Sequence, residues 1–162
     1  MNIVISDTTA LIILAKSDTL ILLNNIFEEI YIPKAVQNEL DIKDDIVKYR
    51  IKNFDKISLK EVTDVGILNQ IKKLNIDKGE IEAISLALEL DLKLIIDERK
   101  GRKIAINQGI KVVGALGILI ENYRQNFISL EESYYFFRLF KKNGLRISDS
   151  LEKIFMDRLR KL

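Results

Sequence analysis

Asn2-Ile3-Val4-Ile5-Ser6, near the start of the chain, is a short run rich in β-branched residues, which is typical of a buried strand. Similar runs recur at residues 29–32, 92–96 and 110–113, and a weaker one lies at 56–59. Longer stretches of helical character separate these runs. Such an alternation predicts β/α units, and we therefore expect an α/β fold around a mostly parallel sheet.

Helices are predicted where the sequence offers a start signal. Pro33 suits the first position of a helix over residues 33–40, and Asp77 suits the N-cap of a helix that runs to about residue 90. Further helices are predicted at residues 115–123, from 129 to near Asn143-Gly144, and after a cap at Ser148 or Asp149. Because no linker or repeat is visible, residues 1–162 are expected to form a single domain, on which residues 127–162 pack as a helical extension.

Composition narrows the chemistry that is open to the protein. The 26 basic and 24 acidic residues nearly cancel, so any site for a polyanion must be local. The chain has no cysteine and no histidine, which excludes disulfides, thiolate catalysis, Cys/His zinc sites and imidazole bases. No apolar run approaches the roughly 20 residues that a membrane span needs, and no signal peptide is indicated. We expect a cytoplasmic protein that works through carboxylates, hydroxyls, lysines or a metal ion.

Two aspartates directly follow predicted strands. Asp7 comes after residues 2–6, and Asp97 comes after residues 92–96. Ligands of open α/β sheets bind beyond the carboxyl ends of the strands, which makes both aspartates candidate site residues. Alternatively, each is the cap of the helix that follows its strand.

Two glutamates fall on the apolar faces of predicted helices. At about 100° per residue, Glu80 lies in the middle of the arc that holds Ala83, Ile84 and Ala87. The side chains predicted to face solvent on the opposite side of this helix are Glu82, Ser85 and Glu89. Alternatively, Glu80 completes a capping box with Asp77.

Glu39 repeats this pattern between Ala35 and Val36, and its alternative is a salt bridge. A carboxylate that faces the core is costly unless it is paired or bound to a cation. Four clustered acids, Asp7, Glu39, Glu80 and Asp97, would repel one another, and a divalent cation would keep all of them ionised. An oxygen-only ligand set favours Mg²⁺ or Mn²⁺ over zinc, and metal-assisted phosphoryl transfer follows as the expected chemistry.

A basic run follows Asp97 and contains Arg99, Lys100, Arg102 and Lys103. Next to a metal site, these side chains are expected to hold a phosphate backbone of RNA. Alternatively, the run is an ordinary solvated surface.

Four ordered stretches of the chain carry a resemblance to a known family. They are Val4-Ile5-Ser6-Asp7-Thr8-Thr9-Ala10-Leu11, Ile32-Pro33-Lys34-Ala35-Val36-Gln37-Asn38-Glu39-Leu40, Gly79-Glu80-Ile81-Glu82-Ala83-Ile84-Ser85-Leu86-Ala87 and Leu94-Ile95-Ile96-Asp97-Glu98-Arg99-Lys100-Gly101-Arg102. In this order they resemble the PIN-domain family, and within it the VapC-like toxins. Residues 112–117 and 144–149 resemble a PIN-like branch with an extended C-terminus.

The resemblance implies a three-layer α/β/α sandwich and an endoribonuclease that uses Mg²⁺ or Mn²⁺. Position by position, it implies that Asp7, Glu39, Glu80 and Asp97 are the catalytic and metal-binding acids, with Glu98 as the substitute for Asp97. Thr9 would be the hydroxyl residue that supports the site. The third position, usually Asp in VapC-like proteins, is Glu80 here.

The leading hypothesis is a metal-dependent ribonuclease that acts as the toxin of a toxin–antitoxin pair and is restrained by a small antitoxin protein. A homodimer is also expected, although the aromatic residues of the tail would serve equally as intramolecular core. The alternative is a PIN-like module that binds RNA or a protein without cutting. An ordinary nucleotide-binding domain is disfavoured, because Asp7-Thr8-Thr9 stands where a glycine-rich phosphate loop would follow the first strand.

Overall fold

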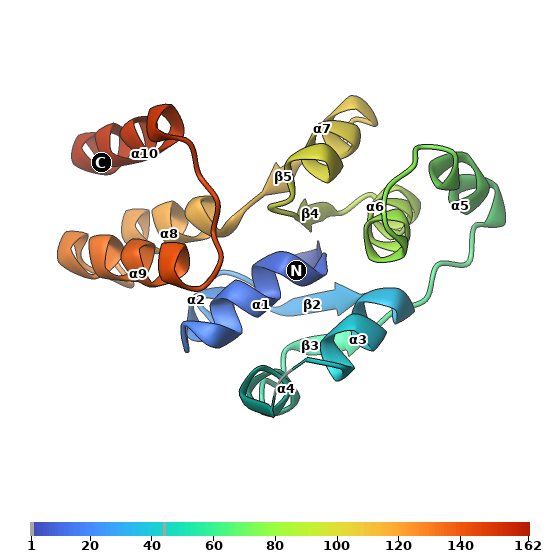
Figure 1. Cartoon of the computed structure of the whole chain (residues 1–162), viewed down its shortest axis with the longest axis horizontal. Coiled ribbons are helices and arrows are strands. Elements are labelled where there is room, and N and C mark those ends of the chain that lie inside the picture. Colours follow the sequence, from blue (N-terminus) through green and yellow to red (C-terminus); the bar gives the residue numbers. More distant parts are fainter. Residues whose placement is uncertain (1, 44) are drawn as a thin grey trace.

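Five parallel strands form the central sheet in the computed structural model, which describes residues 2–43 and 45–162 (Figure 1). Their order across the sheet is β3-β2-β1-β4-β5. The strands are β1 (Ile3–Ser6), β2 (Glu29–Ile32), β3 (Ile57–Leu59), β4 (Lys93–Ile95) and β5 (Val112–Val113). All four pairings are parallel, so the predicted α/β class with a mostly parallel sheet is confirmed, and the weak run at 56–59 is a true edge strand.

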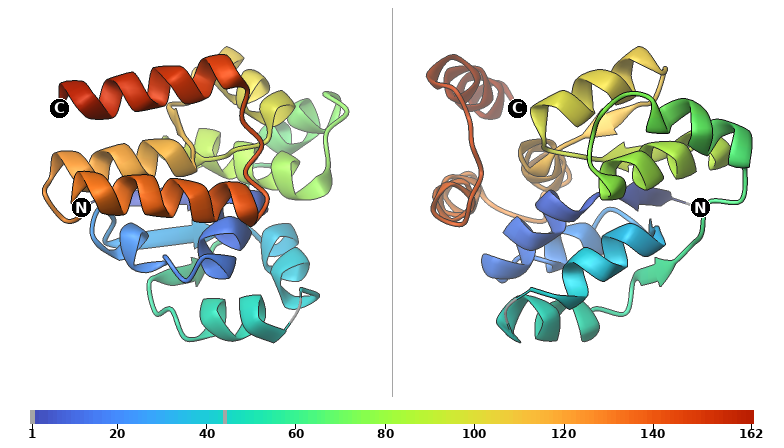
Figure 2. Two further views of the ribbon diagram at one scale, coloured as in Figure 1. Left: turned by 60° about the vertical axis from the view of Figure 1, so that its left-hand side comes forward. Right: turned by 45° about the vertical axis from the view of Figure 1, so that its right-hand side comes forward.

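Helices flank both faces of this sheet, which gives the expected three layers. They are α1 (Thr8–Lys16), α2 (Ile21–Asn24), α3 (Lys34–Asp41), α4 (Asp45–Lys52), α5 (Val65–Lys72), α6 (Lys78–Leu90), α7 (Arg99–Asn107), α8 (Ala115–Arg124), α9 (Leu130–Lys142) and α10 (Asp149–Lys161). The helices α1, α3 and α4 pack together on one side, and α5 and α6 pack together on the other (Figure 2). None of the helices in the described ranges is both long and apolar enough to cross a membrane.

The observed helix starts lie at or next to the residues that the local start signals predicted. Asp77 caps α6 as predicted, and Ser148 rather than Asp149 caps α10. Ser129 caps α9 through a complete capping box with Glu132. Pro33 is the N-cap of α3 and not its first helical residue, a shift of one position. The helices α1, α2, α4, α5 and α7 were not individually predicted.

The hydrophobic core includes the C-terminal helices. Phe137 and Phe140 of α9 and Phe155 of α10 are buried, and the rings of Phe137 and Phe155 lie 4.8 Å apart. Asn122 of α8 is fully buried and donates hydrogen bonds to the Leu22 and Ile118 carbonyls. These aromatic residues of the tail are therefore core within one chain, which leaves the expected homodimer without their support.

The aromatic residues of α9 offer a test of how the extension is joined to the rest of the molecule. We expect Phe137→Ala to lower the free energy of unfolding by about 3 to 5 kcal/mol, because it opens a cavity in a packed core. Tyr135→Ala on the same helix is the matched control, since Tyr135 is 52% exposed. Urea unfolding followed by circular dichroism measures both. Two separate transitions in the parent protein would contradict the predicted single domain over residues 1–162.

Candidate metal and nuclease site

Asp7 lies at the centre of the carboxyl edge of the sheet. It directly follows β1, which pairs with both β2 and β4, and its backbone amide donates to the Ile95 carbonyl at 2.9 Å. The residue precedes the first turn of α1, but its side chain makes no capping bond to that helix. Only 3% of Asp7 is exposed. The helix-cap alternative therefore does not account for the burial of this carboxylate.

Glu80 reaches the same region from the first turn of α6, and it is buried. Asp77 accepts a hydrogen bond from the Glu80 amide at 2.8 Å, which is one half of a capping box. The other half, from the Asp77 amide to the Glu80 carboxylate, is not formed in the part of the chain that is described. The Glu80 carboxylate instead interacts with the side chain of Asp77, and Glu80 is buried, as its place on the apolar helix face indicated.

Glu39 approaches from α3, where the backbone of α6 comes close. A Cβ added at Gly79 would overlap the Glu39 carboxylate, so glycine at this position lets the carboxylate lie against the start of α6. Glu39 is half-buried and forms no ion pair with any described residue. The salt-bridge alternative for Glu39 is therefore not supported within the described residues.

Burial and neighbouring negative charges raise the pKa values of two of these carboxylates. Burial raises the pKa of Asp7 to about 7 against the opposing effect of the Thr8 backbone amide, and the negative charges of Asp77, Glu39 and Glu98 add to this rise. Burial also raises the pKa of Glu80 to about 8, with further contributions from Asp77, Asp7 and Glu98. These residues form what we term the acidic cluster, whose members are Asp7, Glu39, Asp77, Glu80 and Glu98.

Asp97 and Glu98 have different surroundings, although they are adjacent in sequence. The Asp97 carboxylate accepts from the Ala115 amide at 3.0 and 3.2 Å and thereby caps α8. Burial raises the pKa of Asp97, while the Ala115 amide and the charge of Arg102 act in the opposite direction. Of these two residues, Glu98 is the one whose charge raises the pKa values of Asp7 and Glu80, and it also accepts from the Gly101 amide at 2.7 Å.

Asp77 was predicted only as a helix cap, and its membership of the cluster was missed. A signal was available, because an N-cap residue lies three positions before the inward-facing Glu80 and close to it in space. The N-cap bond itself brings the two carboxylates together.

The face of α6 opposite Glu80 does not meet solvent as predicted. Ser85 is fully buried, and Glu82 accepts from the Ala35 amide of α3 at 3.2 Å. Glu89 accepts from Thr63, including its amide at 2.9 Å. The prediction of a solvated face is wrong for Ser85, and Glu82 and Glu89 are only partly exposed, because α3 and α5 pack against α6.

The two threonines after Asp7 lie in different environments. Thr9, predicted as the supporting hydroxyl, is exposed and lines a groove beside the acids. Thr8 is buried, and its hydroxyl has no hydrogen-bond partner within the described residues. A buried hydroxyl is normally paired, so Thr8 leaves an unused donor and acceptor directly beside Asp7.

The acidic cluster matches the ligand preference of a hard divalent cation, because all its side-chain donors are carboxylate oxygens. Asp7, Glu39 and Glu80 also have no ion-pair partner in the described chain. Within residues 2–43 and 45–162, no three acids already stand together in an arrangement that could hold a metal ion. Binding of Mg²⁺ or Mn²⁺ would therefore require the side chains to rotate toward one another.

The basic run forms the first turns of α7, and its side chains have different surroundings. Arg99, Arg102 and Lys103 line a groove of about 1210 Å³ that Asp97 and Glu98 also line. Lys100 instead donates to the Asn75 carbonyl at 2.9 Å. Arg102 donates to the Ile96 carbonyl at 2.9 Å, so part of its hydrogen-bonding capacity is used within the chain. Three of the four predicted RNA-binding side chains thus share one surface.

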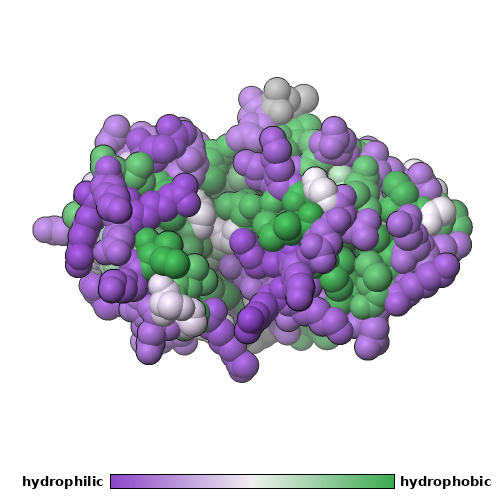
Figure 3. All heavy atoms as spheres, turned by 90° about the horizontal axis from the view of Figure 1, so that it is seen from above, coloured by the Kyte–Doolittle hydropathy of each residue, from purple (hydrophilic) through white to green (hydrophobic). Residues whose placement is uncertain are grey.

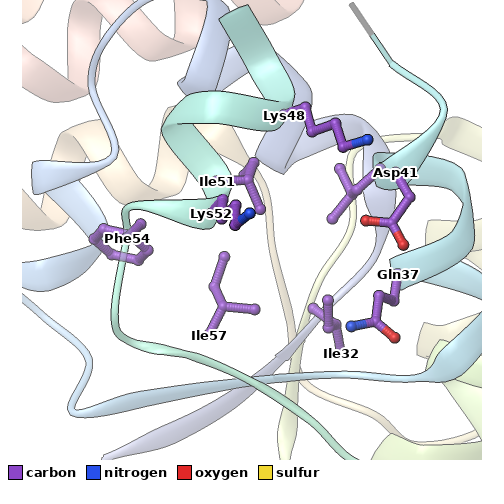
Figure 4. Close-up of a pocket in the computed structure, with 9 residues that line it drawn as sticks. Ile32, Gln37, Asp41, Lys48, Ile51, Lys52, Phe54 and Ile57 are labelled. Carbon is purple, nitrogen blue, oxygen red and sulfur yellow. The ribbon is translucent and has the colours of Figure 1, made fainter. Parts of the chain in front are cut away.

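A second hollow, of about 510 Å³, lies between α3, α4 and the strands β2 and β3 (Figure 4). Ile32, Ile51 and Ile57 give it an apolar lining, and Lys48 and Asp41 lie near each other at its edge. It contains no member of the acidic cluster, so the reaction is not assigned to it.

Comparisons with known proteins agree with this architecture. The model of a family described as "DUF3368: PIN domain" matches residues 3–161. Among solved structures, the VapBC2 complex from Rickettsia felis bound to a DNA fragment from its promoter contains a similar fold. The TM-score is 0.53 at 15% sequence identity, and the alignment covers 69% of this chain and 98% of the other. No curated protein sequence matches the chain.

The burial of Asp7 makes stability depend on pH. Between about pH 4 and pH 7 the folded protein keeps a proton that the unfolded chain has released, so stability falls as the pH rises through this window. Asp7→Asn removes the ionisable group. Without divalent cations, its stability relative to the parent protein should therefore increase by about 2 kcal/mol between pH 5 and pH 8.

Urea unfolding in EDTA at the two pH values measures this difference. Asp91→Asn is the matched control, because Asp91 is exposed at the opposite end of α6 and has the left-handed backbone that asparagine also adopts. A parent protein that becomes more stable between pH 5 and pH 8 relative to Asp7→Asn would contradict the electrostatic account.

Proposed function

Because this chain belongs to the PIN-domain family, we propose that it is an endoribonuclease that hydrolyses RNA phosphodiester bonds with Mg²⁺ or Mn²⁺. The observation that carries the proposal is the acidic cluster at the carboxyl edge of the sheet. Asp7 and Glu80 are buried there with raised pKa values and without a compensating cation from the described chain. Perturbed carboxylates gathered in this way are more typical of a functional site than of a structural one.

In this proposal, Asp7, Glu39 and Glu80 hold the cation, and Glu98 is the fourth acid. Glu98 and Asp97 each accept from a helix amide. Glu98 is preferred to Asp97 because its charge is among the causes that raise the pKa values of Asp7 and Glu80, whereas that of Asp97 is not. A divalent cation supplies Lewis acidity toward a phosphodiester and neutralises the negative charge that develops in the transition state. Asp97 is then a positioning residue, which orients α8 and Arg102, and Thr9 supports the site from its edge.

The proposed biological role is that of a toxin which a small antitoxin protein restrains. The similar fold within a VapBC2 complex supports this role, because that protein assembles with a partner. A homodimer and a cytoplasmic location also remain predictions. The alternative function is an RNA- or protein-binding module without cleavage, which would keep the surface of α7 but make no use of the buried acids.

Cleavage of a structured RNA in Mn²⁺ tests the proposal. We expect Asp7→Asn and Glu80→Gln each to lower the cleavage rate by at least about 100-fold, because each removes a charged ligand and keeps the side-chain size. Asp91→Asn should cleave at the parental rate. Equal cleavage by the parent protein and Asp7→Asn would rule out the assignment of the acids.

A binding measurement separates the nuclease from the binding module. Mn²⁺ should raise the melting temperature of the parent protein at pH 8 but not that of Asp7→Asn, since a ligand that binds only the folded state stabilises it. Absence of both the shift and cleavage, with RNA still bound, would favour the binding module.

Glu98 and Asp97 are distinguished by a second pair of variants. We expect Glu98→Gln to raise the Mn²⁺ concentration needed for half-maximal cleavage by about 10-fold, because it removes a charge from the cluster. Asp97→Asn keeps an oxygen that accepts from the Ala115 amide, and it should leave the Mn²⁺ dependence close to that of the parent protein. If Asp97→Asn raises the required Mn²⁺ concentration and Glu98→Gln does not, the fourth acid is Asp97.

A further inference from the structure

We propose that the groove between α7 and the segment that joins α9 to α10 is a channel for single-stranded RNA, with the C-terminal extension as one of its walls. The groove is lined on one side by α7 and on the other by residues 144–148 and the first turn of α10. This inference rests on the proposed function, because it names the form in which the substrate reaches the same acids.

Positive charge stands on both walls of the groove. Arg99 and Lys103 lie on α7, and Arg146 lies on the opposite wall; all three are exposed. None of them forms an ion pair within residues 2–43 and 45–162. Unpaired cations on facing walls complement a chain of phosphates, which supplies negative charge at each nucleotide.

Apolar side chains between these cations give the groove its second feature. Ile106 is 54% exposed and Leu151 is 48% exposed, and they face the groove from α7 and α10. Seen from above in Figure 3, the hollow beside α10 has hydrophobic residues on its floor and hydrophilic residues along its rims. Unpaired bases offer apolar faces to such a floor, whereas a duplex keeps the faces of its bases stacked inside.

The groove also leads to the acids. Thr9, Asp97 and Glu98 line it near the carboxyl edge of the sheet, and Glu98 belongs to the acidic cluster. A strand held by the two walls would therefore pass beside the proposed reaction site. The negative charge of the cluster repels phosphates at this end, which makes the cations of the walls necessary for binding.

The same surface properties would also suit an acidic peptide with apolar side chains. We argue for RNA because the groove is continuous with the proposed hydrolytic site and because cations stand on both walls, Arg99 and Lys103 on α7 and Arg146 on the other. A peptide is kept as an outcome of the test.

Fluorescence anisotropy in EDTA tests the channel without cleavage. The probes are a labelled single-stranded oligoribonucleotide, a perfectly paired RNA duplex of the same sequence, and poly-L-glutamate. We expect Arg146→Ala to weaken binding of the single strand about 5-fold and to lower the slope of log K against log salt by about 0.7, as for the loss of one phosphate contact. Leu151→Ser should weaken binding of the single strand and leave binding of the duplex unchanged.

Arg138→Ala on α9 is the matched control, because Arg138 is exposed and does not line the groove. Thermal melting by circular dichroism checks that each variant is folded. The channel is overturned if Arg146→Ala and Arg138→Ala bind the single strand equally, or if the duplex binds as tightly as the single strand. It is also overturned if poly-L-glutamate binds as tightly as RNA and loses affinity in Leu151→Ser, since the groove is then a peptide site.

The channel and the nuclease assignment fail in different experiments. Cleavage that depends on Asp7, together with unchanged binding by Arg146→Ala, would retain the nuclease and remove the channel. Binding that depends on Arg146 and Leu151 in a protein that does not cleave RNA would retain the channel and remove the nuclease.

Discussion

The parallel pairing of β1 with both of its neighbours is the constraint on which the rest of the site depends. Because β1 lies between β2 and β4, the residue that follows it is enclosed by the ends of both neighbouring strands. The hydrogen bond from the Asp7 amide to Ile95 extends this pairing by one residue beyond the strand. Asp7 is therefore held at a buried position where an ionised carboxylate loses most of its hydration, and its pKa rises to about 7 for that reason.

Acids elsewhere in the chain have surroundings that stabilise their charged form. Hydrogen bonds from Arg124 and Gln125 lower the pKa of Glu121 to about 2, and Glu152 pairs with Lys141 at 3.1 Å. Those carboxylates are stabilised in their charged form, whereas the members of the acidic cluster are buried beside one another. A fold that tolerates mutual repulsion at one edge of its sheet is less stable than it could be, and such a cost is characteristic of a functional site.

Local patterns allowed much of this arrangement to be predicted. The strands followed from short β-branched runs, and the inward direction of Glu80 followed from its angular position on a helix, which depends only on neighbours in sequence. The same reasoning failed for Ser85, because a helix packed on two sides has no solvated face and only the positions of α3 and α5 reveal this. The sequence left open whether Asp97 or Glu98 is the fourth acid, since a shift of one residue after β4 changes which carboxylate is directed toward Asp7.

The sequence by itself determined the α/β class, most strand positions, the capped helices and the exclusion of cysteine and histidine chemistry, because these depend on composition and on short-range periodicity. Only the tertiary structure decided which acids share one electrostatic environment, since Glu39 meets Gly79 forty residues away in the chain through the packing of α3 on α6. It also decided that Arg146 faces the groove opposite Arg99, a relation between distant segments that no local pattern encodes. Long-range packing places charges next to one another, and their proximity sets the pKa values and surface charge on which the proposed chemistry depends.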